Sequence, residues 1–245
     1  ERYGVNAELT STLRCAYHKY TFRPDDDKKV LVDITRTNNG VRDWSIQKVD
    51  DHTFSGNQDA EGNIRFYAVS NYKIEDIRQL KDGEHEVSVV SFADSKGSKP
   101  LELKIGFSFV SIDNAKMNLE QEMKDKSFAQ VRKEADKTWE NLLSKIEVTG
   151  GTEREKGIFY SCLYRSFLWP ALRSDVNGEY TDAKGNVVNN GFRYYTDPSF
   201  WDDYRNKLIL LGMISPDVTT DVIKSITDKG EKRKAKWLYA DLLPW

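Results

Sequence analysis

The sequence has few of the residues and patterns on which several classes of protein depend. Its 245 residues include only two cysteines, Cys15 and Cys162, which excludes a framework of disulfides. Its three histidines stand singly, without the spacing of a zinc site. No apolar stretch approaches the ~18 residues needed to cross a membrane, so we expect no membrane span. The 37 basic and 39 acidic residues nearly cancel, so we expect no nucleic acid partner.

The first 110 residues carry the pattern of β-strands. Turn residues such as Pro24-Asp25 and Lys81-Asp82-Gly83 separate short apolar runs. In the clearest run, apolar residues occupy every second position from residue 101 to residue 109. This alternation is typical of a half-buried antiparallel strand. The regular spacing of such runs predicts an antiparallel β-sandwich.

At residue 111 the pattern changes to that of helices. Ser127 and Gln130 predict a capping box in front of an apolar stripe that runs to Ile146. A helix from Glu153 is apolar on more than one side, which is typical of a helix that lies between neighbours; this chain lacks those neighbours, so we expect an exposed apolar face on it. A later helix is expected to begin at Pro216. The chain therefore reads as strands followed by helices.

Two local patterns that suggest a metal or a nucleophile have a simpler structural interpretation. Asp175, Asn177 and Asp182 are spaced faintly like a calcium loop, but the bidentate Glu and other ligand positions are missing, which favours a hairpin turn. Cys162 lies within a helical pattern with no histidine close in sequence, which predicts a packing role. We therefore expect no metal-ligating residue in this chain.

The segment 194–205, YYTDPSFWDDYR, combines aromatic and acidic side chains at the expected start of a helix. Aromatic faces cover the C–H patches of a pyranose, and carboxylates accept hydrogen bonds from vicinal hydroxyls, so the segment suits sugar recognition. The structural alternative stays open. Acids in a first helical turn complement the helix dipole, and Trp201 and Arg205 could stack on each other.

This segment belongs to a longer stretch with a recognisable pattern. Residues 158–180, IFYSCLYRSFLWPALRSDVNGEY, and residues 191–216, GFRYYTDPSFWDDYRNKLILLGMISP, resemble glycoside hydrolase family 92, the calcium-dependent exo-acting α-mannosidases. The earlier stretches GVNAELTSTLRCAYHKYTF and SFVSIDNAKMNLEQEM are also similar to the family. The resemblance extends to about residue 230, whereas residues 231–245 are atypical.

The resemblance implies an α+β multidomain architecture. An antiparallel β-sandwich would occupy residues 1–110 and would be incomplete at its N-terminus. A helical linker would follow at 111–150, and residues 151–245 would form the first helices of an (α/α)6 toroid that is truncated at its C-terminus. The missing remainder of the toroid would then be an intramolecular partner of this chain.

The resemblance also implies an activity, namely inverting, calcium-dependent hydrolysis of terminal mannose from glycans, as in N-glycan processing. By match to the family motif, Asp202 would hydrogen-bond hydroxyls of the terminal mannose, Trp201 would line the same pocket and Arg205 would support it. The catalytic acid and base and most calcium ligands are expected outside this chain. We therefore expect the chain alone to be inactive, and we expect a periplasmic or secreted location.

One stretch departs from the family pattern. Around Ser55-Gly56-Asn57, many family members carry a Trp-containing loop that reaches the active site, and its absence here bears on linkage preference. Two other functions stay open beside the enzyme. A non-catalytic carbohydrate-binding β-sandwich module is the main alternative, and a structural remnant that no longer binds sugar is the other.

Overall fold

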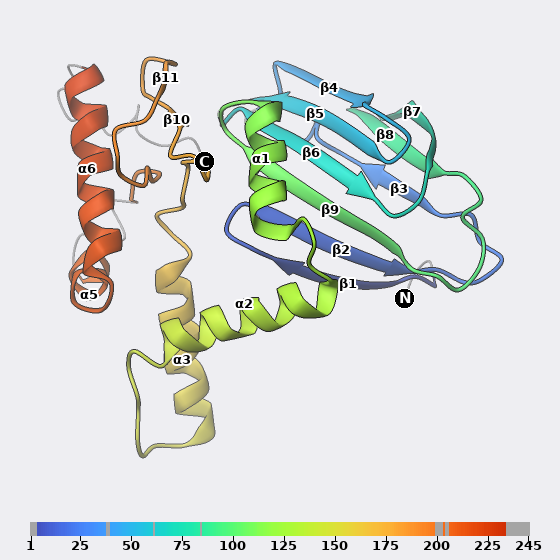
Figure 1. The fold of residues 1–245 in the computed structure, drawn as a ribbon. Helices are drawn as coiled ribbons and strands as arrows, with labels where there is room; N and C mark the ends of the chain where they lie inside the picture. Colours follow the sequence, from blue (N-terminus) through green and yellow to red (C-terminus); the bar gives the residue numbers. More distant parts are fainter. Residues whose placement is uncertain are drawn as a thin grey trace. The chain divides into compact units, whose positions relative to one another are not determined.

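A computed structural model describes residues 4–37, 40–60, 62–83, 85–198, 203 and 206–233 (Figure 1). The chain divides into two compact units, one up to Arg132 and one from Lys133 onward. Each unit is described by itself. Among the described residues, every helix is too short or too polar to cross a lipid bilayer.

The first unit is built from two antiparallel sheets. One sheet has six strands in the order β1-β2-β9-β6-β5-β4, and the other has three strands in the order β3-β8-β7. The strands are β1 (Asn6–Ser11), β2 (Cys15–Thr21), β3 (Lys29–Val32), β4 (Asp43–Lys48), β5 (Thr53–Asp59), β6 (Ile64–Ser70), β7 (Ile74–Asp82), β8 (His85–Phe92) and β9 (Leu101–Ser108).

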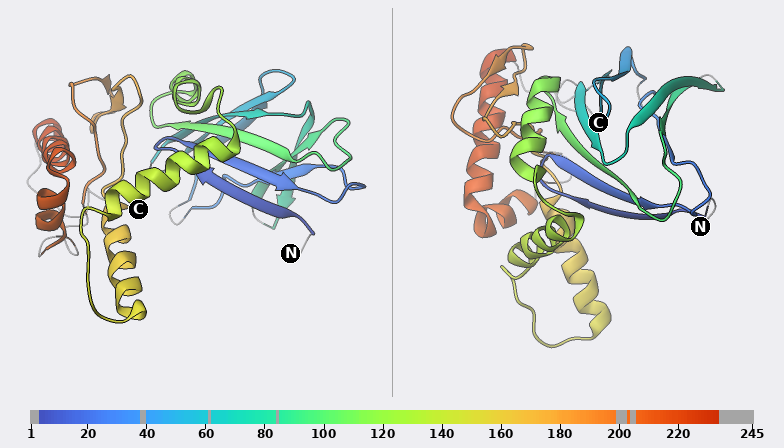
Figure 2. Two further views of the ribbon diagram at one scale, coloured as in Figure 1. Left: turned by 60° about the horizontal axis from the view of Figure 1, so that its bottom comes forward. Right: turned by 45° about the vertical axis from the view of Figure 1, so that its right-hand side comes forward.

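The two sheets pack face to face around one apolar core, and their layers are visible in the right-hand view of Figure 2. Phe54 and Phe66 from the larger sheet meet edge to face, with ring centroids 6.0 Å apart. Val90 and Phe92 enter the same core from the smaller sheet. Leu101 supplies a fully buried residue from β9. The predicted sandwich is confirmed.

A helix covers the outer face of the six-stranded sheet. Helix α1 (Ile112–Met123) begins after Ser111, whose side chain accepts the backbone N–H of Asn114. It lies against β9 and β6 (Figure 1). Gly106 of β9 makes this approach possible, because a Cβ there would overlap the carbonyl oxygen of Ala115 and lie 2.9 Å from the Cβ of Leu119.

Further helices and a short hairpin follow. They are α2 (Phe128–Leu143), α3 (Glu153–Phe167), β10 (Tyr180–Thr181), β11 (Val187–Val188), α5 (Lys207–Ile214) and α6 (Pro216–Arg233). The predicted capping box of α2 is confirmed, since the N–H of Gln130 donates to Ser127 Oγ and the N–H of Ser127 donates to Gln130 Oε1. Helix α6 begins at Pro216 as predicted.

Helix α3 has the exposed apolar surface expected of a helix whose neighbours this chain lacks, and it corrects the expectation for Cys162. Within the described chain, Leu163 is its one buried residue, whereas Ile158 is largely exposed. Cys162, which the sequence pattern assigned to packing, is exposed. The reason is that no element in the described part of the chain covers this side of α3. Apolar residues on several faces therefore did not identify which face is buried here.

Candidate functional site

The three predicted substrate-binding residues, Trp201, Asp202 and Arg205, lie outside the described residues. The structure does describe the chain on both sides of them, up to Pro198 and again at Asp203. The candidate site is therefore built from the groups that hold these two flanks.

The flank before the candidate residues is a short extended stretch, and the chain around Leu172 pairs with it. Leu172 and Tyr195 form an antiparallel bridge. The backbone N–H of Arg173 donates to the carbonyl of Tyr194 at 2.7 Å, and the N–H of Thr196 donates to that of Ala171 at 2.8 Å. The stretch is buried throughout. Its backbone is thus fixed along one side.

Helix α6 holds the same stretch through a buried lysine. Lys229 Nζ donates to the carboxylate of Asp197 at 2.6 Å and to the carbonyl oxygen of Tyr195 at 2.8 Å. The N–H of Tyr195 in turn donates to Ser225 Oγ at 3.0 Å. The indole N–H of Trp169 donates to the carbonyl of Asp197 at 2.8 Å. Asp197 is therefore fixed by both its side chain and its backbone.

A stacked pair of tyrosines lies beside this stretch. The rings of Tyr180 and Tyr194 are 3.8 Å apart and nearly parallel. Lys229 lies over Tyr194 at 4.9 Å, and Lys232 lies over Tyr180 at 5.7 Å. Burial and the nearby Asp228 raise the pKa of Tyr180 to about 12, and they also raise the pKa of Tyr194. Both phenols therefore stay protonated near neutral pH, and neither is suited to act as a base.

Two further carboxylates meet Lys232 of α6. Its Nζ lies 3.1 Å from Asp182 Oδ2 and 2.9 Å from Asp228 Oδ1. Burial alone would lower the pKa of Lys232, but these two carboxylates outweigh burial and raise it. Asp182 also accepts backbone N–H groups from Lys184 and Asn186, as a turn residue does. This supports the hairpin interpretation of the calcium-like spacing.

The flank after the candidate residues carries a second buried acid. Asp203 is buried, and its Oδ1 lies 3.2 Å from Nζ of Lys207, four residues later in α5. Its Oδ2 has no hydrogen-bond partner within the described residues. Buried ion pairs thus stand on both sides of the candidate segment.

The residues of α6 that contact the stretch before the candidate residues and the neighbouring hairpin were not identified from the sequence. They lie along one face of α6, at positions 221, 225, 228, 229 and 232. Arg193 Nε and Asp221 Oδ2 add an ion pair of 2.7 Å to this face. The helical spacing of these polar residues was the one sequence feature that could have indicated a buried polar face, but such a face is more often solvated than buried.

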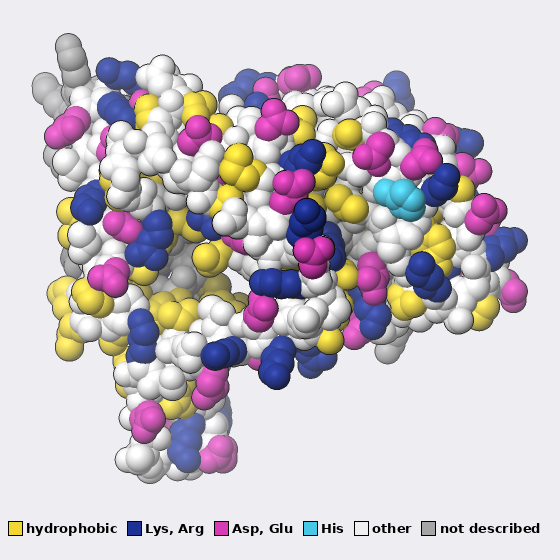
Figure 3. Space-filling view, in the orientation of Figure 1, with side chains coloured by type: hydrophobic (Ala, Val, Ile, Leu, Met, Phe, Trp, Pro, Cys, Tyr) yellow, Lys and Arg dark blue, Asp and Glu magenta, His cyan; other side chains and the backbone are white. Residues whose placement is uncertain are grey.

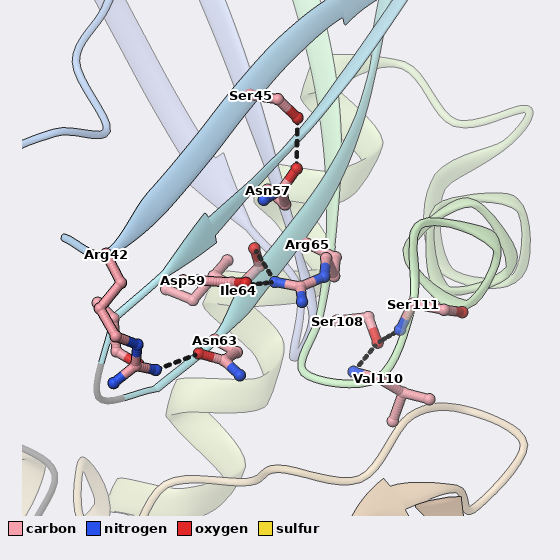
Figure 4. Close-up of polar contacts among 11 residues, drawn as sticks. Arg42, Ser45, Asn57, Asp59, Asn63, Ile64, Arg65, Ser108, Val110 and Ser111 are labelled. Carbon is pink, nitrogen blue, oxygen red and sulfur yellow. Dashed lines mark hydrogen bonds and ion pairs between the residues drawn. The ribbon is translucent and has the colours of Figure 1, made fainter. Parts of the chain in front are cut away.

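The first unit contains a polar cluster on β4, β5 and β6 (Figure 4). The hydroxyl of Ser45 donates to the side-chain oxygen of Asn57, and Arg65 pairs with Asp59 at 2.6 Å. Residues 55–57 lie within β5, where Gly56 packs under the ring of Phe66. Residues 55–57, where the sequence departs from the family pattern, are thus part of a regular strand; Asn57 is paired with Ser45, whereas the buried hydroxyl of Ser55 has no hydrogen-bond partner within the described residues.

A hollow of about 540 Å³ lies against the three-stranded sheet of the first unit. Four carboxylates and three cationic side chains line it, and Asp76 pairs with Arg78 at 2.6 Å. Within the described residues its one aromatic side chain, Phe92, is buried in the core. The described lining of this hollow is therefore mainly charged.

The architecture defines a class of protein, a β-domain followed by the start of a helical domain. The same arrangement occurs in the solved structure of the family GH92 alpha-mannosidase BT3965 from Bacteroides thetaiotaomicron, with a TM-score of 0.86 and 24% identity over 100% of this chain and 35% of that chain. The structure of that enzyme in complex with mannoimidazole matches with a TM-score of 0.85 and 25% identity, over 100% of this chain and 34% of that chain. The inverting mannosidase BT2199 of the same organism and family matches with a TM-score of 0.79 and 24% identity, over 93% of this chain and 33% of that chain.

Two family models match the sequence itself. The glycosyl hydrolase family 92 N-terminal domain matches residues 1–108, and the glycosyl hydrolase family 92 catalytic domain matches residues 114–240. The chain therefore belongs to glycosyl hydrolase family 92. It spans about a third of the length of the solved structures that it matches. No curated protein sequence gives a significant match.

Proposed function

We propose that this chain is the part of an inverting, calcium-dependent exo-α-mannosidase that recognises the terminal mannose of a glycan. The observation that carries the proposal is the match of both family domains, in order, along the chain. A solved relative bound to mannoimidazole supports a mannose-like ligand. The class of enzyme, a glycoside hydrolase, follows from the family.

The proposed roles follow the family motif in segment 194–205. Asp202 accepts hydrogen bonds from hydroxyls of the mannose, Trp201 lines the pocket and Arg205 supports it. A binding group is effective when its backbone is held by a rigid shell. On the two described flanks of this motif, Asp197 and Asp203 are buried and paired with lysines.

We place the catalytic acid and base outside this chain. An inverting pair of carboxyl groups stands roughly 6.5–9.5 Å apart, with one group free to protonate the leaving oxygen and the other to activate water. The buried carboxylates Asp182 and Asp197 are instead bound to lysines. We therefore expect the chain by itself not to release mannose.

The resemblance to the family is the only basis for including calcium in the proposal. The described residues contain no group of three acidic, histidine or cysteine side chains that could hold a metal ion. They do not form a calcium site, and we derive no step through calcium here. Its ligands, the remainder of the toroid, a role in N-glycan processing and a periplasmic or secreted location all belong to the proposal for the whole enzyme.

The proposal is tested by titrating the chain with methyl α-mannoside in a calorimeter. We expect weak binding that Asp202→Ala abolishes, while Asp136→Ala on α2, an exposed acid, leaves it unchanged. Release of mannose from an α-mannoside is assayed in parallel, with and without a calcium chelator. Binding that survives Asp202→Ala would contradict the proposed site. Chelator-sensitive mannose release would contradict the placement of the acid and base elsewhere.

A further inference from the structure

Helix α1 and the first turn of α2 share a buried cluster with the outer face of the six-stranded sheet. The buried members of this cluster are Cys15, Tyr17, Leu119, Met123, Phe128 and Val131. Tyr17 of β2 and Phe128 of α2 meet edge to face, with ring centroids 5.4 Å apart. Phe128 and Val131 are the two buried residues of α2. The buried part of α2 therefore ends at Val131, next to the boundary of the first unit.

A lysine of the sheet holds the turn between these two helices. Nζ of Lys104, in β9, donates to the carbonyl oxygens of Met123 and Lys124 at 3.0 and 3.1 Å. The last turn of α1 contains no basic residue. A cation at this end of a helix satisfies carbonyl groups that have no partner within the helix, and it complements the helix dipole. Lys104 therefore supplies from a strand the cation that the last turn of α1 lacks.

A second contact joins the end of α1 to the turn between β1 and β2. Glu122 accepts the hydroxyl of Thr12, the backbone N–H of Arg14 at 3.1 Å and the guanidinium of Arg14 at 2.8 Å. A carboxylate near the C-terminal end of a helix opposes the helix dipole, so its position there depends on these partners. The side chains of this ion pair are only 15% and 13% exposed. Both contacts attach α1 to strands of the first unit.

We propose that Lys104 makes α1 and the first turn of α2 a cooperative part of the first unit, so that these helical segments open together with the sheet. The two family models divide the sequence between residues 108 and 114, at the start of α1. The buried cluster places the boundary of cooperative unfolding further along the chain, after Val131. Loosening of the second unit would then leave the outer face of the sheet covered. This inference is independent of whether the chain binds sugar.

Native-state hydrogen exchange of the whole chain tests the proposal, because the amides of one cooperative unit share one free energy of opening. Leu211→Ala removes a buried side chain of α5 and so perturbs the second unit. We expect it to speed exchange in α6 at least about tenfold and to leave exchange in α1 and β9 unchanged. Exchange that speeds up in α1 as it does in α6 would contradict the proposal.

Lys104→Met tests the lysine itself. We expect exchange in α1, in residues 124–131 and in β9 to speed up together by about tenfold, with exchange in α6 unchanged. Lys104→Arg, which keeps the charge, should recover most of the protection. Lys133→Met is the matched control, because Lys133 is exposed on α2 beyond its last buried residue, and it should leave all these rates unchanged.

Faster exchange in residues 124–131 without any change in β9 would contradict the proposal, because Lys104 would then hold the turn without coupling it to the sheet. If Lys104→Met does not fold, Glu122→Gln replaces it, since this variant weakens the contact with Arg14. It should speed exchange in α1 and β9 together, by a smaller factor than Lys104→Met. A change confined to α1 in Glu122→Gln would contradict the proposal as well.

Discussion

Replacement of Gly106 by alanine tests how closely α1 is seated on the six-stranded sheet. The new methyl group would overlap the carbonyl oxygen of Ala115 and lie 2.9 Å from the Cβ of Leu119. Both obstacles belong to the backbone or to the root of a side chain, so no flexible group can move aside. Overpacking of this kind costs about 1–3 kcal/mol. Alanine recovers about 0.5–1 kcal/mol from the lower entropy of its unfolded chain.

The expected net result for Gly106→Ala, the cost less the recovery, is a loss of about 1 kcal/mol in the free energy of unfolding. Urea denaturation followed by far-UV circular dichroism measures it, with the slope m unchanged. Gly157→Ala in α3 is the matched control, because a Cβ there meets no atom within 4 Å. It should stabilise α3 by about 0.5–1 kcal/mol. A Gly106→Ala protein within about 0.5 kcal/mol of the wild type would refute the close seating of α1.

Three further predictions concern thiols, acid stability and exposed apolar surface. A thiol reagent should modify Cys162 at once but Cys15 only on unfolding, since burial and then Glu122 raise the pKa of Cys15 to about 12; equal rates would contradict this. Burial raises the pKa of Asp182, but its hydrogen bonds and ion pair outweigh burial and lower it, so its contribution to stability is present above pH ~4 and lost below. Asp182→Asn should therefore flatten the decline of stability measured by denaturant titration below pH ~4, and an unchanged decline would exclude this role. Ile209 and Met213 are exposed on α5, where Figure 3 shows hydrophobic side chains gathered, so replacing both with serine should reduce binding of a hydrophobic dye; undiminished binding would assign it to another surface.

Much of the fold was predictable because it depends on local pattern. The alternation after residue 101 became β9, which ends at Ser108, and the capping residues at Ser127 mark the start of α2. Such signals need only the nearest residues along the chain. The change from strands to helices near residue 111 is therefore visible in the amino-acid pattern alone.

The contacts that hold the candidate site were not predictable in this way. Lys229 and Lys232 look like solvated charges on α6, and only the folded chain brings them onto Asp197 and Asp182. Cys162 shows the opposite error, because its apolar surroundings in sequence suggested a burial that the structure does not have. Both outcomes depend on which distant segments pack against a helix, and helical periodicity does not carry that information.

The position of α6 has a consequence for the order of folding. Asp197 and its cation at Lys229 are separated by 32 residues, and Tyr195 is separated from the same lysine by 34. During synthesis, Tyr195 and Asp197 are therefore made before Lys229, the residue that binds both of them. The strands of the first unit can form while Tyr195 and Asp197 still lack their contacts with Lys229. The buried stretch 194–198 would thus acquire its contacts with Lys229 late, with helix α6, rather than when Tyr195 and Asp197 are first made.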